Sequence, residues 1–410
     1  MAMTDPKQGH TALITMALLA VALGFTSATQ DIVIDAYRIE ITPTHLLSMS
    51  AASYSLGYRL AMILAGGVAF ILSDFFGSSL NNYQYVAWQW TYAIMSLAGC
   101  LGIVTTLVIR EPVNSRPALG ADGSKQLLLL FIILLIPFIS IFYYWQPLWS
   151  QVIDFQQMSP LSLFLFKVLR FVIAALACYL TARLLIQSTW VSTDIAATAY
   201  WQPVKEFIQR YPLRLVILLL LLIGFYRVSD MVLGVVANMF YQQLGYSKTD
   251  IGIVSKTFGI GVTLLGTVIG GLLTVRIGVM RMMMLGAVLS AATNLLFILL
   301  AYSGAHLPLL FVVISADNLA AGFASIAFVT FLSRLSNIRF TAMQYAIFSS
   351  LMALLPRVIG GYSGTIVEAY SYPTFFLITT VLGIPVIVLV WLVGKQLTFA
   401  DDNATMPTSH

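Results

Sequence analysis

Long apolar runs separated by short polar segments occupy most of this 410-residue chain. The runs are about 20 residues long, which is the length a helix needs to cross the hydrocarbon core of a bilayer. Lipid offers the backbone no hydrogen-bond partners, and the runs do not alternate with period two, so they predict helices and not barrel strands. About eleven spans are predicted, over residues 11–34, 48–72, 85–109, 127–147, 161–186, 213–238, 251–274, 279–302, 307–332, 340–365 and 373–393.

The composition also favours an integral membrane protein. Hydrophobic residues make up 59% of the chain and charged residues 9%, whereas a soluble domain has roughly a quarter charged residues. The net charge of +5 is spread singly between the apolar runs, so it does not indicate a nucleic-acid partner. Cys100 and Cys178 lie in separate runs and the four histidines lie at segment ends, so we expect no metal site and no cofactor. With no nucleophile beside a base, we expect no enzyme.

Basic residues are divided unequally between the two alternating sets of loops. One set contains Arg38, Arg110, Arg116, Lys125, Lys205, Arg210, Arg214, Arg276, Arg281, Arg334, Arg339 and Lys395. The other set contains Lys7 and Lys248. By the positive-inside rule the first set is cytoplasmic. This predicts a cytoplasmic C-terminus and a periplasmic N-terminus.

A weak internal repeat relates an early span to a late one. Residues 49–67 match residues 343–361 at a single offset, with Met49 opposite Met343 and Leu60 opposite Leu354. Both copies start at a cytoplasmic loop, so a parallel repeat is possible, and parallel repeats of six helices build transporters of the major facilitator type.

The loop after the seventh span is similar to the G-x-L-x-D-R-x-G-R signature of the same transporters. Gly271, Leu273, Arg276 and Gly278 match it, whereas valines replace the Asp and the final Arg. Glycines at this position allow a tight turn between two closely packed helices. The predicted fold is therefore an all-α major facilitator-type helical bundle.

The repeat also predicts how the chain is organised. Residues 1–112 would be a partial N-terminal half of three spans, residues 113–198 an inserted pair of spans, residues 199–396 a complete six-span half, and residues 397–410 a cytoplasmic tail. The first half would then lack three earlier helices, which agrees with the N-terminus being outside. Residues 199–211 read as an amphipathic helix that joins the halves on the cytoplasmic face.

An ordered series of short motifs resembles the AmpG-type muropeptide permeases from about Leu19 onward. The first is Gln30-Asp-Ile-Val-Ile-Asp35-Ala, which looks like the family's Q-D-I-V-x-D-A motif. The others follow in the same order as in the family: Leu56-Gly-Tyr-Arg59, Tyr226-Arg-Val-Ser-Asp230, Lys256-Thr-Phe-Gly259, Asp317-Asn-Leu319 and Phe340-Thr-Ala-Met-Gln344. The related acetyl-CoA transporter family shares parts of this pattern.

The resemblance implies proton-coupled import of anhydromuropeptides, which are anionic glycopeptides, across the bacterial inner membrane for peptidoglycan recycling. In some bacteria this import feeds the induction of β-lactamase. Two alternatives stay open. The cargo would otherwise be acetyl-CoA or another anionic metabolite, or the chain would be a truncated permease that does not transport.

Charged and amide side chains inside the predicted spans are the candidates for substrate binding or proton coupling. Such side chains are costly in the hydrocarbon core, so each is expected to have a polar partner or a function. They are Gln30, Asp31, Asp35, Arg59, Arg227, Asp230, Lys256, Asp317, Asn318 and Arg357. Asp31 and Asp35 share one helix face with Arg38, either as a local ion cluster or as a proton carrier. Arg59 and Arg357 lie deep in their spans and would bind carboxylates. Arg227 and Asp230 are expected to form a pair, which Lys256 would join.

Overall fold

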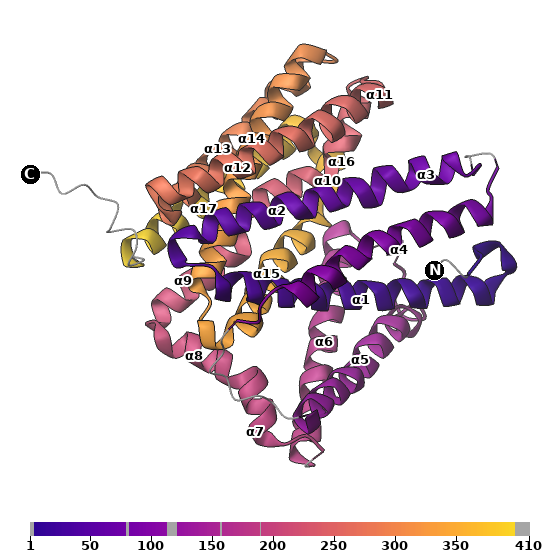
Figure 1. Ribbon diagram of the computed structural model, residues 1–410. Coiled ribbons are helices and arrows are strands. Elements are labelled where there is room, and N and C mark those ends of the chain that lie inside the picture. Colours follow the sequence, from indigo (N-terminus) through magenta and orange to yellow (C-terminus); the bar gives the residue numbers. More distant parts are fainter. Residues whose placement is uncertain (1–3, 79–81, 113–120, 156–157, 189, 398–410) are drawn as a thin grey trace, which may run out of the picture.

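The computed structural model describes residues 4–78, 82–112, 121–155, 158–188 and 190–397. Helices account for nearly all of this part, and no β-strand forms within these ranges, which agrees with the predicted all-α fold (Figure 1). The predicted tail lies almost wholly outside the described residues, as does the loop over residues 113–120. The predicted domain boundaries remain predictions.

Ten helical segments of the described residues are long and apolar enough to cross a membrane. Four are single helices that belong to the predicted first half and to the predicted insertion. They are α1 (His10–Ile41), α4 (Tyr85–Val108), α5 (Ala121–Trp149) and α6 (Pro160–Gln187). The six of the second half are α9 (Leu213–Phe225) with α10 (Val228–Gln243), α11 (Lys248–Ile251) with α12 (Gly259–Ile277), α13 (Val279–Ser303), α14 (Leu307–Leu335), α15 (Thr341–Gly360) with α16 (Ser363–Tyr370), and α17 (Tyr372–Gln396).

The remaining predicted span, residues 48–72, is helical but divided. It comprises α2 (Leu47–Ile63), a π-helical turn (Leu64–Val68) and α3 (Ala69–Phe75), and each piece is shorter than 18 residues. The repeat-related span breaks at the corresponding place, where α15 ends at Gly360 and α16 begins at Ser363. The two repeat-related spans are thus both interrupted near the same place.

The second half forms the packed core of the molecule. Helix α14 packs against α12 and α13, and α17 packs against α13. Gly266 and Gly322 make the α12–α14 crossing close: a Cβ on Gly266 would lie 2.8 Å from the Leu319 carbonyl oxygen, and one on Gly322 would lie 2.8 Å from the Gly266 carbonyl carbon. Only residues without a side chain fit such an approach, as is usual for helices packed in a membrane.

The predicted tight turn after the seventh span is confirmed. Helix α12 ends at Ile277 and α13 begins at Val279, so Gly278 is the only residue between them. Its φ of 87° lies in the left-handed region, which glycine adopts without steric cost.

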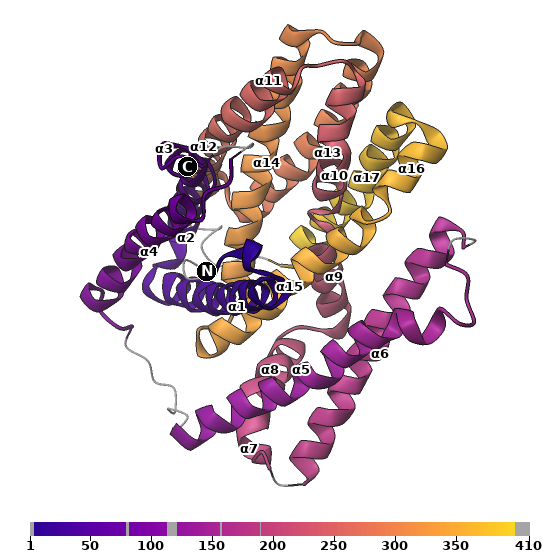
Figure 2. The ribbon, with the colours of Figure 1, turned by 90° about the vertical axis from the view of Figure 1, so that its right-hand side faces the viewer.

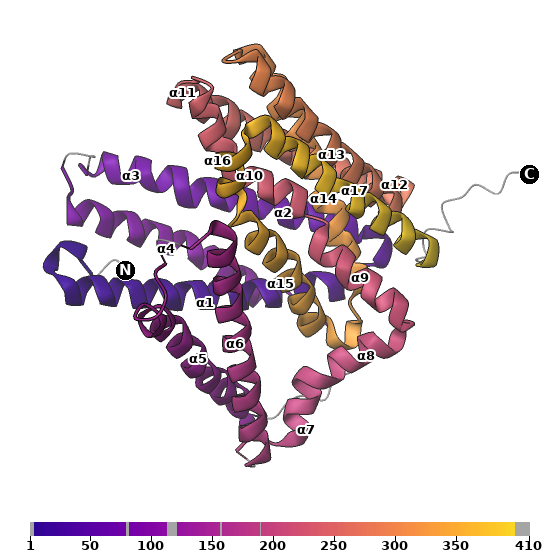
Figure 3. The same cartoon turned by 180° about the vertical axis from the view of Figure 1, so that it is seen from behind.

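Among the described residues, the first half contacts the second where α1 finishes and α2 begins. Helix α1 contacts α15 there, and α2 contacts α12 and α14. Ser48 Oγ donates to the Gly271 carbonyl oxygen at 3.1 Å, and Ala51 and Ala52 pack on Ile326. Away from this end the halves diverge toward α3 and α11 (Figures 1 and 3).

The inserted pair α5 and α6 stands to one side of the six-span half (Figure 2). The two helices pack against each other along their length. Trp145 and Trp149 of α5 lie against Phe166 of α6, which fixes one end of the pair.

The predicted amphipathic linker helix is confirmed as α8 (Gln202–Arg210). Arg210 holds Glu206 in two charge-assisted hydrogen bonds, of 2.9 Å from Nε and 2.6 Å from Nη2. Asn337 and Gln344, which flank the loop between α14 and α15, also donate to Glu206 at 2.7 and 2.6 Å. Burial alone would raise the pKa of Glu206, but these hydrogen bonds outweigh burial and leave the pKa below its ordinary value. The network fastens the linker to the second half.

Candidate functional site

A polar cluster lies inside the second half, where α10 faces α13 and α14. Arg227 precedes the first turn of α10, and Asp230 lies three residues further on, so both side chains project from the same face. Arg227 Nη2 lies 3.2 Å from Asp230 Oδ2, which confirms the predicted pair. Ser290 of α13 donates to Asp230 Oδ1 at 2.8 Å, and Arg227 also donates to Ser325 of α14. Three helices therefore hold one ion pair.

A second carboxylate, Asp317 of α14, completes this cluster. Its Oδ1 accepts a hydrogen bond of 3.4 Å from Thr293 of α13. Its charge is repelled by that of Asp230 and attracted by that of Arg227. Asp317 thus lies within the electrostatic reach of the Arg227–Asp230 salt bridge.

Polar side chains extend the cluster toward α17. Asn294 Nδ2 donates to Ser229 Oγ at 2.7 Å, and Ser229 donates to the Thr379 carbonyl oxygen at 2.8 Å. The Asn294 Oδ1 atom is buried and has no hydrogen-bond partner in the described part of the chain. A buried acceptor of this kind is costly, so it offers a place for a water molecule or a donor from a ligand.

Arg59 brings a further positive charge from the first half. It lies on α2, near enough to Arg227 for the two guanidinium charges to repel each other. Among the described residues, no carboxylate forms a salt bridge with Arg59. With Arg59, the cluster contains two guanidinium groups and two carboxylates, and a guanidinium is a suitable partner for an anion.

Asp35 and Arg38 form a separate ion pair where the two halves meet. Arg38 Nη2 lies 3.1 Å from Asp35 Oδ1 and donates to Ser333 Oγ of α14 at 3.1 Å. Both charged residues are buried, and the guanidinium lies 5.9 Å from the ring of Tyr345 on α15. This arrangement favours the prediction that Asp35 belongs to a local ion cluster over the prediction that it carries protons. Asp31, one turn earlier on α1, is exposed.

Lys256 does not join the Arg227–Asp230 pair. It lies in the π-helical turn Gly252–Phe258 between α11 and α12, is exposed, and forms no salt bridge within the described ranges.

Asn318 fills a structural position between α12 and α14. Its Oδ1 accepts from Thr263 at 2.7 Å, and its Nδ2 donates to the Ile314 carbonyl oxygen at 2.9 Å. With both amide atoms used, it stabilises the helix crossing.

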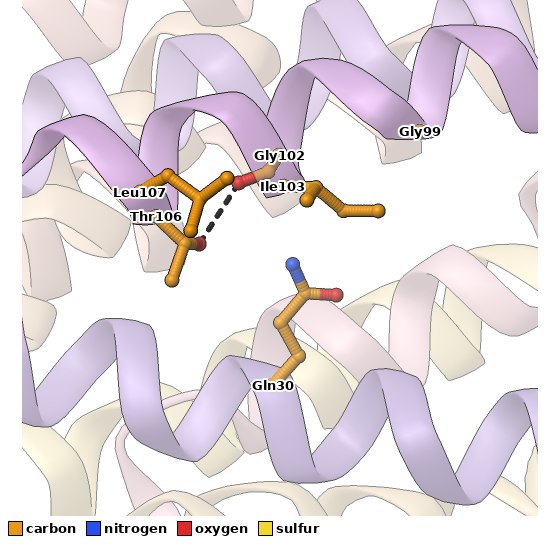
Figure 4. A pocket seen from close by; sticks show the side chains of 6 residues that line it. All are labelled: Gln30, Gly99, Gly102, Ile103, Thr106 and Leu107. Carbon is orange, nitrogen blue, oxygen red and sulfur yellow. Dashed lines mark hydrogen bonds between the residues drawn. The ribbon is translucent and has the colours of Figure 1, made fainter.

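Gln30 lies apart from the charged cluster. It lines a cavity of about 310 Å³ between α1 and α4, together with Gly99, Gly102 and Thr106. Figure 4 shows the Gln30 amide reaching from α1 toward α4. The Thr106 hydroxyl of α4 donates its hydrogen bond to the Gly102 carbonyl oxygen. The amide is thus available to a ligand or a water molecule.

Arg357 also lies apart, in a cavity of about 410 Å³ between α15–α16 and the inserted helix α6. Lys167 and Arg170 of α6 line the same cavity. Arg357 thus lines a cavity, but this cavity does not include Arg227 or Asp230 in its lining.

The residues that complete the cluster were not predicted from the sequence. Ser290, Thr293 and Asn294 occupy one face of α13 at three- and four-residue spacing, and Ser325 follows Asp317 by about two turns of α14. That spacing of polar residues inside an apolar run was the available signal.

A bundle of membrane-crossing helices around a partly buried set of charges is typical of a membrane transporter, and the family and the relatives that the chain matches are transporters and not enzymes. The Major Facilitator Superfamily model matches residues 2–201 and 218–404, so the chain belongs to this superfamily. It is 26% identical over 403 residues to the anhydromuropeptide permease of Escherichia coli strain K12, covering 98% of this chain and 65% of that protein.

Other relatives have related names. A putative transporter AmpG 4 of Rickettsia conorii is 24% identical over 384 residues, covering 94% of this chain and 73% of its own length. A putative transporter AmpG 1 of Rickettsia felis is 25% identical over 395 residues, with coverages of 96% and 78%. These matches confirm the resemblance to AmpG-type permeases, and this chain spans about two thirds to four fifths of the relatives' length.

Proposed function

We propose that this protein imports anhydromuropeptides across the bacterial inner membrane with protons, for peptidoglycan recycling. The observation that carries the proposal is the Arg227–Asp230 salt bridge inside the second half, which Ser290 of α13 and Ser325 of α14 join by hydrogen bonds. Arg59 contributes a second guanidinium from the other half, and its charge interacts with that of Arg227. Anhydromuropeptides carry several carboxylates, and a guanidinium binds a carboxylate in a bidentate, permanently charged contact. The E. coli relative named anhydromuropeptide permease supports this choice of anion.

The cluster also suggests how protons would drive uptake. When Asp230 is ionised, its salt bridge occupies Arg227. A proton taken up by Asp230 would release Arg227 to bind a substrate carboxylate together with Arg59. Loss of that proton on the other side would restore the Arg227–Asp230 salt bridge and expel the substrate. Asp317 would hold the proton in the same way, because it interacts with the same arginine.

The orientation follows from the basic loops. The end at which the halves meet carries the basic loop residues and would be cytoplasmic by the positive-inside rule. The halves diverge toward the other end (Figure 3). This arrangement suits a state that receives substrate from the periplasm, with the C-terminus inside and the N-terminus outside.

Uptake measurements test the proposal. Cells that lack their own permease would express the chain and receive radiolabelled anhydromuropeptide with and without a protonophore, and membrane insertion would be checked by immunoblot. We expect uptake that the protonophore abolishes. Uptake that a protonophore leaves unchanged would refute proton coupling, and uptake of acetyl-CoA but not of muropeptide by membrane vesicles would refute the cargo.

A further inference from the structure

The cavity beside Arg357 has the features of a second anion site. Three basic side chains line it: Lys167 and Arg170 from the inserted helix α6, and Arg357 from α15. The rest of the lining includes aromatic and aliphatic side chains, among them Phe142, Phe164, Phe171 and Tyr362. The cavity of about 410 Å³ therefore combines a cationic group of residues with an apolar wall.

The three basic residues have no acidic partner within the described ranges. Every salt bridge there involves Asp35, Asp122, Glu206 or Asp230. Arg170 lies over the ring of Phe142, with its guanidinium carbon 4.3 Å from the ring centroid. Its Nε atom is buried without a hydrogen-bond partner in the described part of the protein. The site is thus a set of donors without acceptors.

The positions of these residues make the missing acceptors costly. Helix α6 begins at Pro160, so Lys167 and Arg170 lie about 10 and 15 Å along it at 1.5 Å per residue. Charges at that depth of a span are expensive unless they are paired or reach water. Lys167 and Arg357 are exposed and can extend toward the interface, but the buried Nε of Arg170 cannot.

The surroundings indicate where an anion would come from. The inserted pair stands beside the six-span half (Figure 2), and the ring contact Phe164–Tyr362, at 5.7 Å between centroids, links α6 to the second half. A cavity at such a junction within the bilayer is reached by lipids from the side. A phosphate on an apolar tail matches both the cations and the aromatic wall.

We infer that this cavity binds the phosphate headgroup of an anionic phospholipid. Lys167, Arg170 and Arg357 bind the phosphate oxygens, and the acyl chains lie against Phe142 and Phe171. The bound lipid joins the inserted pair to the second half. The inference stands on residues outside the transport site, so it does not depend on the cargo.

The first experiment uses the wild-type chain in detergent. Native mass spectrometry would compare phosphatidylglycerol with phosphatidylcholine at equal concentration, in the presence and absence of inorganic phosphate. We expect selective retention of phosphatidylglycerol that inorganic phosphate at the same concentration does not displace. Equal retention of phosphatidylcholine would overturn the inference, and so would displacement by inorganic phosphate, which would assign the site to a soluble anion.

A variant comparison locates the site. The triple variant Lys167→Gln, Arg170→Gln and Arg357→Gln should bind phosphatidylglycerol at least about tenfold more weakly, because each basic residue near a lipid surface contributes roughly 1 kcal/mol. Arg183→Gln, an exposed cation of the same helix outside the cavity lining, is the matched control. Unchanged binding by the triple variant, or an equal loss in the control, would refute the assignment.

A single variant covers the case in which the triple variant does not fold. Phosphatidylglycerol should raise the melting temperature of the wild type more than phosphatidylcholine does, and Arg170→Gln should remove this difference. If Arg170→Gln keeps the full difference, the cavity is not the lipid site.

Discussion

Arg227 Nη2 lies 3.2 Å from Asp230 Oδ2 at the start of α10, and the same arginine is repelled by Arg59 from the other half of the molecule. The salt bridge therefore forms next to a positive charge that has no carboxylate partner within the described residues. Protonation of Asp230 would leave two arginines beside each other and increase the attraction for an anion. The proposed coupling of protons to substrate rests on this arrangement.

Removing the charge of Asp230 should abolish proton-coupled uptake. In Asp230→Asn the neutral amide can no longer alternate between holding and releasing Arg227, so we expect uptake to fall to the level of cells without the protein. Asp317→Asn should act in the same direction. Uptake of labelled anhydromuropeptide is the measurement, with Asp122→Asn, an exposed aspartate of α5 outside the cluster, as the matched control. If both aspartate variants transport at the wild-type rate, neither acid belongs to the mechanism.

Arg59 should determine substrate affinity. Arg59→Gln removes a charge-assisted contact worth roughly 1.5–3 kcal/mol, so we expect KM to rise by about tenfold or more. Arg59→Lys keeps the charge but not the bidentate geometry, so its KM should be intermediate. Concentration-dependent uptake measures both. A normal KM in Arg59→Gln would show that this arginine does not contact the substrate.

Asp35 should be important for stability and not for proton coupling. Asp35→Asn leaves the buried Arg38 without its counter-ion, and breaking a buried pair costs about 3–5 kcal/mol. We expect a lower melting temperature in detergent, while the protein that folds retains protonophore-sensitive uptake. Stable protein that has lost only the response to protons would instead make Asp35 a proton carrier.

Gly266 and Gly261 provide a matched pair on α12. A Cβ on Gly266 would lie 2.8 Å from a backbone oxygen of α14, whereas a Cβ on Gly261 would meet nothing within 4 Å. Gly266→Ala should therefore destabilise the protein by about 1–3 kcal/mol, as overpacking does, and Gly261→Ala should not. Melting temperatures of the two variants measure this difference, and equal values would contradict the close crossing.

The linker network should make stability depend on acid. Because the pKa of Glu206 is below its ordinary value of 4.5 in the folded protein, its contribution is fully present above the ordinary pKa and is lost as the pH falls through the lowered one. The melting temperature of the wild type should fall more steeply below about pH 4.5 than that of Glu206→Gln. If the melting temperatures of the wild type and of Glu206→Gln fall in parallel as the pH is lowered, the hydrogen bonds of Glu206 do not contribute to the stability of the folded protein.

The sequence by itself determined the helical class and most of the spans. A run of about 20 apolar residues forms a helix in lipid, because a helix makes all the hydrogen bonds of its backbone within the segment. The Arg227–Asp230 pair was also predictable, because residues three apart share a helix face. The turn at Gly278 was predictable too, because glycine adopts the left-handed conformation that the turn needs. Both the salt bridge and the turn depend only on residues that are near one another in the sequence.

The tertiary structure alone decided which distant charges meet. Arg59 and Arg357 both lie deep in repeat-related spans, yet the charge of Arg59 interacts with that of Arg227 whereas Arg357 shares a cavity with Lys167 and Arg170. The sequence places each residue at a depth within its span, but the side of the helix that faces a neighbour depends on how the helices pack. Lys256, predicted to join Arg227 and Asp230, is exposed in the π-helical turn Gly252–Phe258 and forms a salt bridge with no residue of the described ranges.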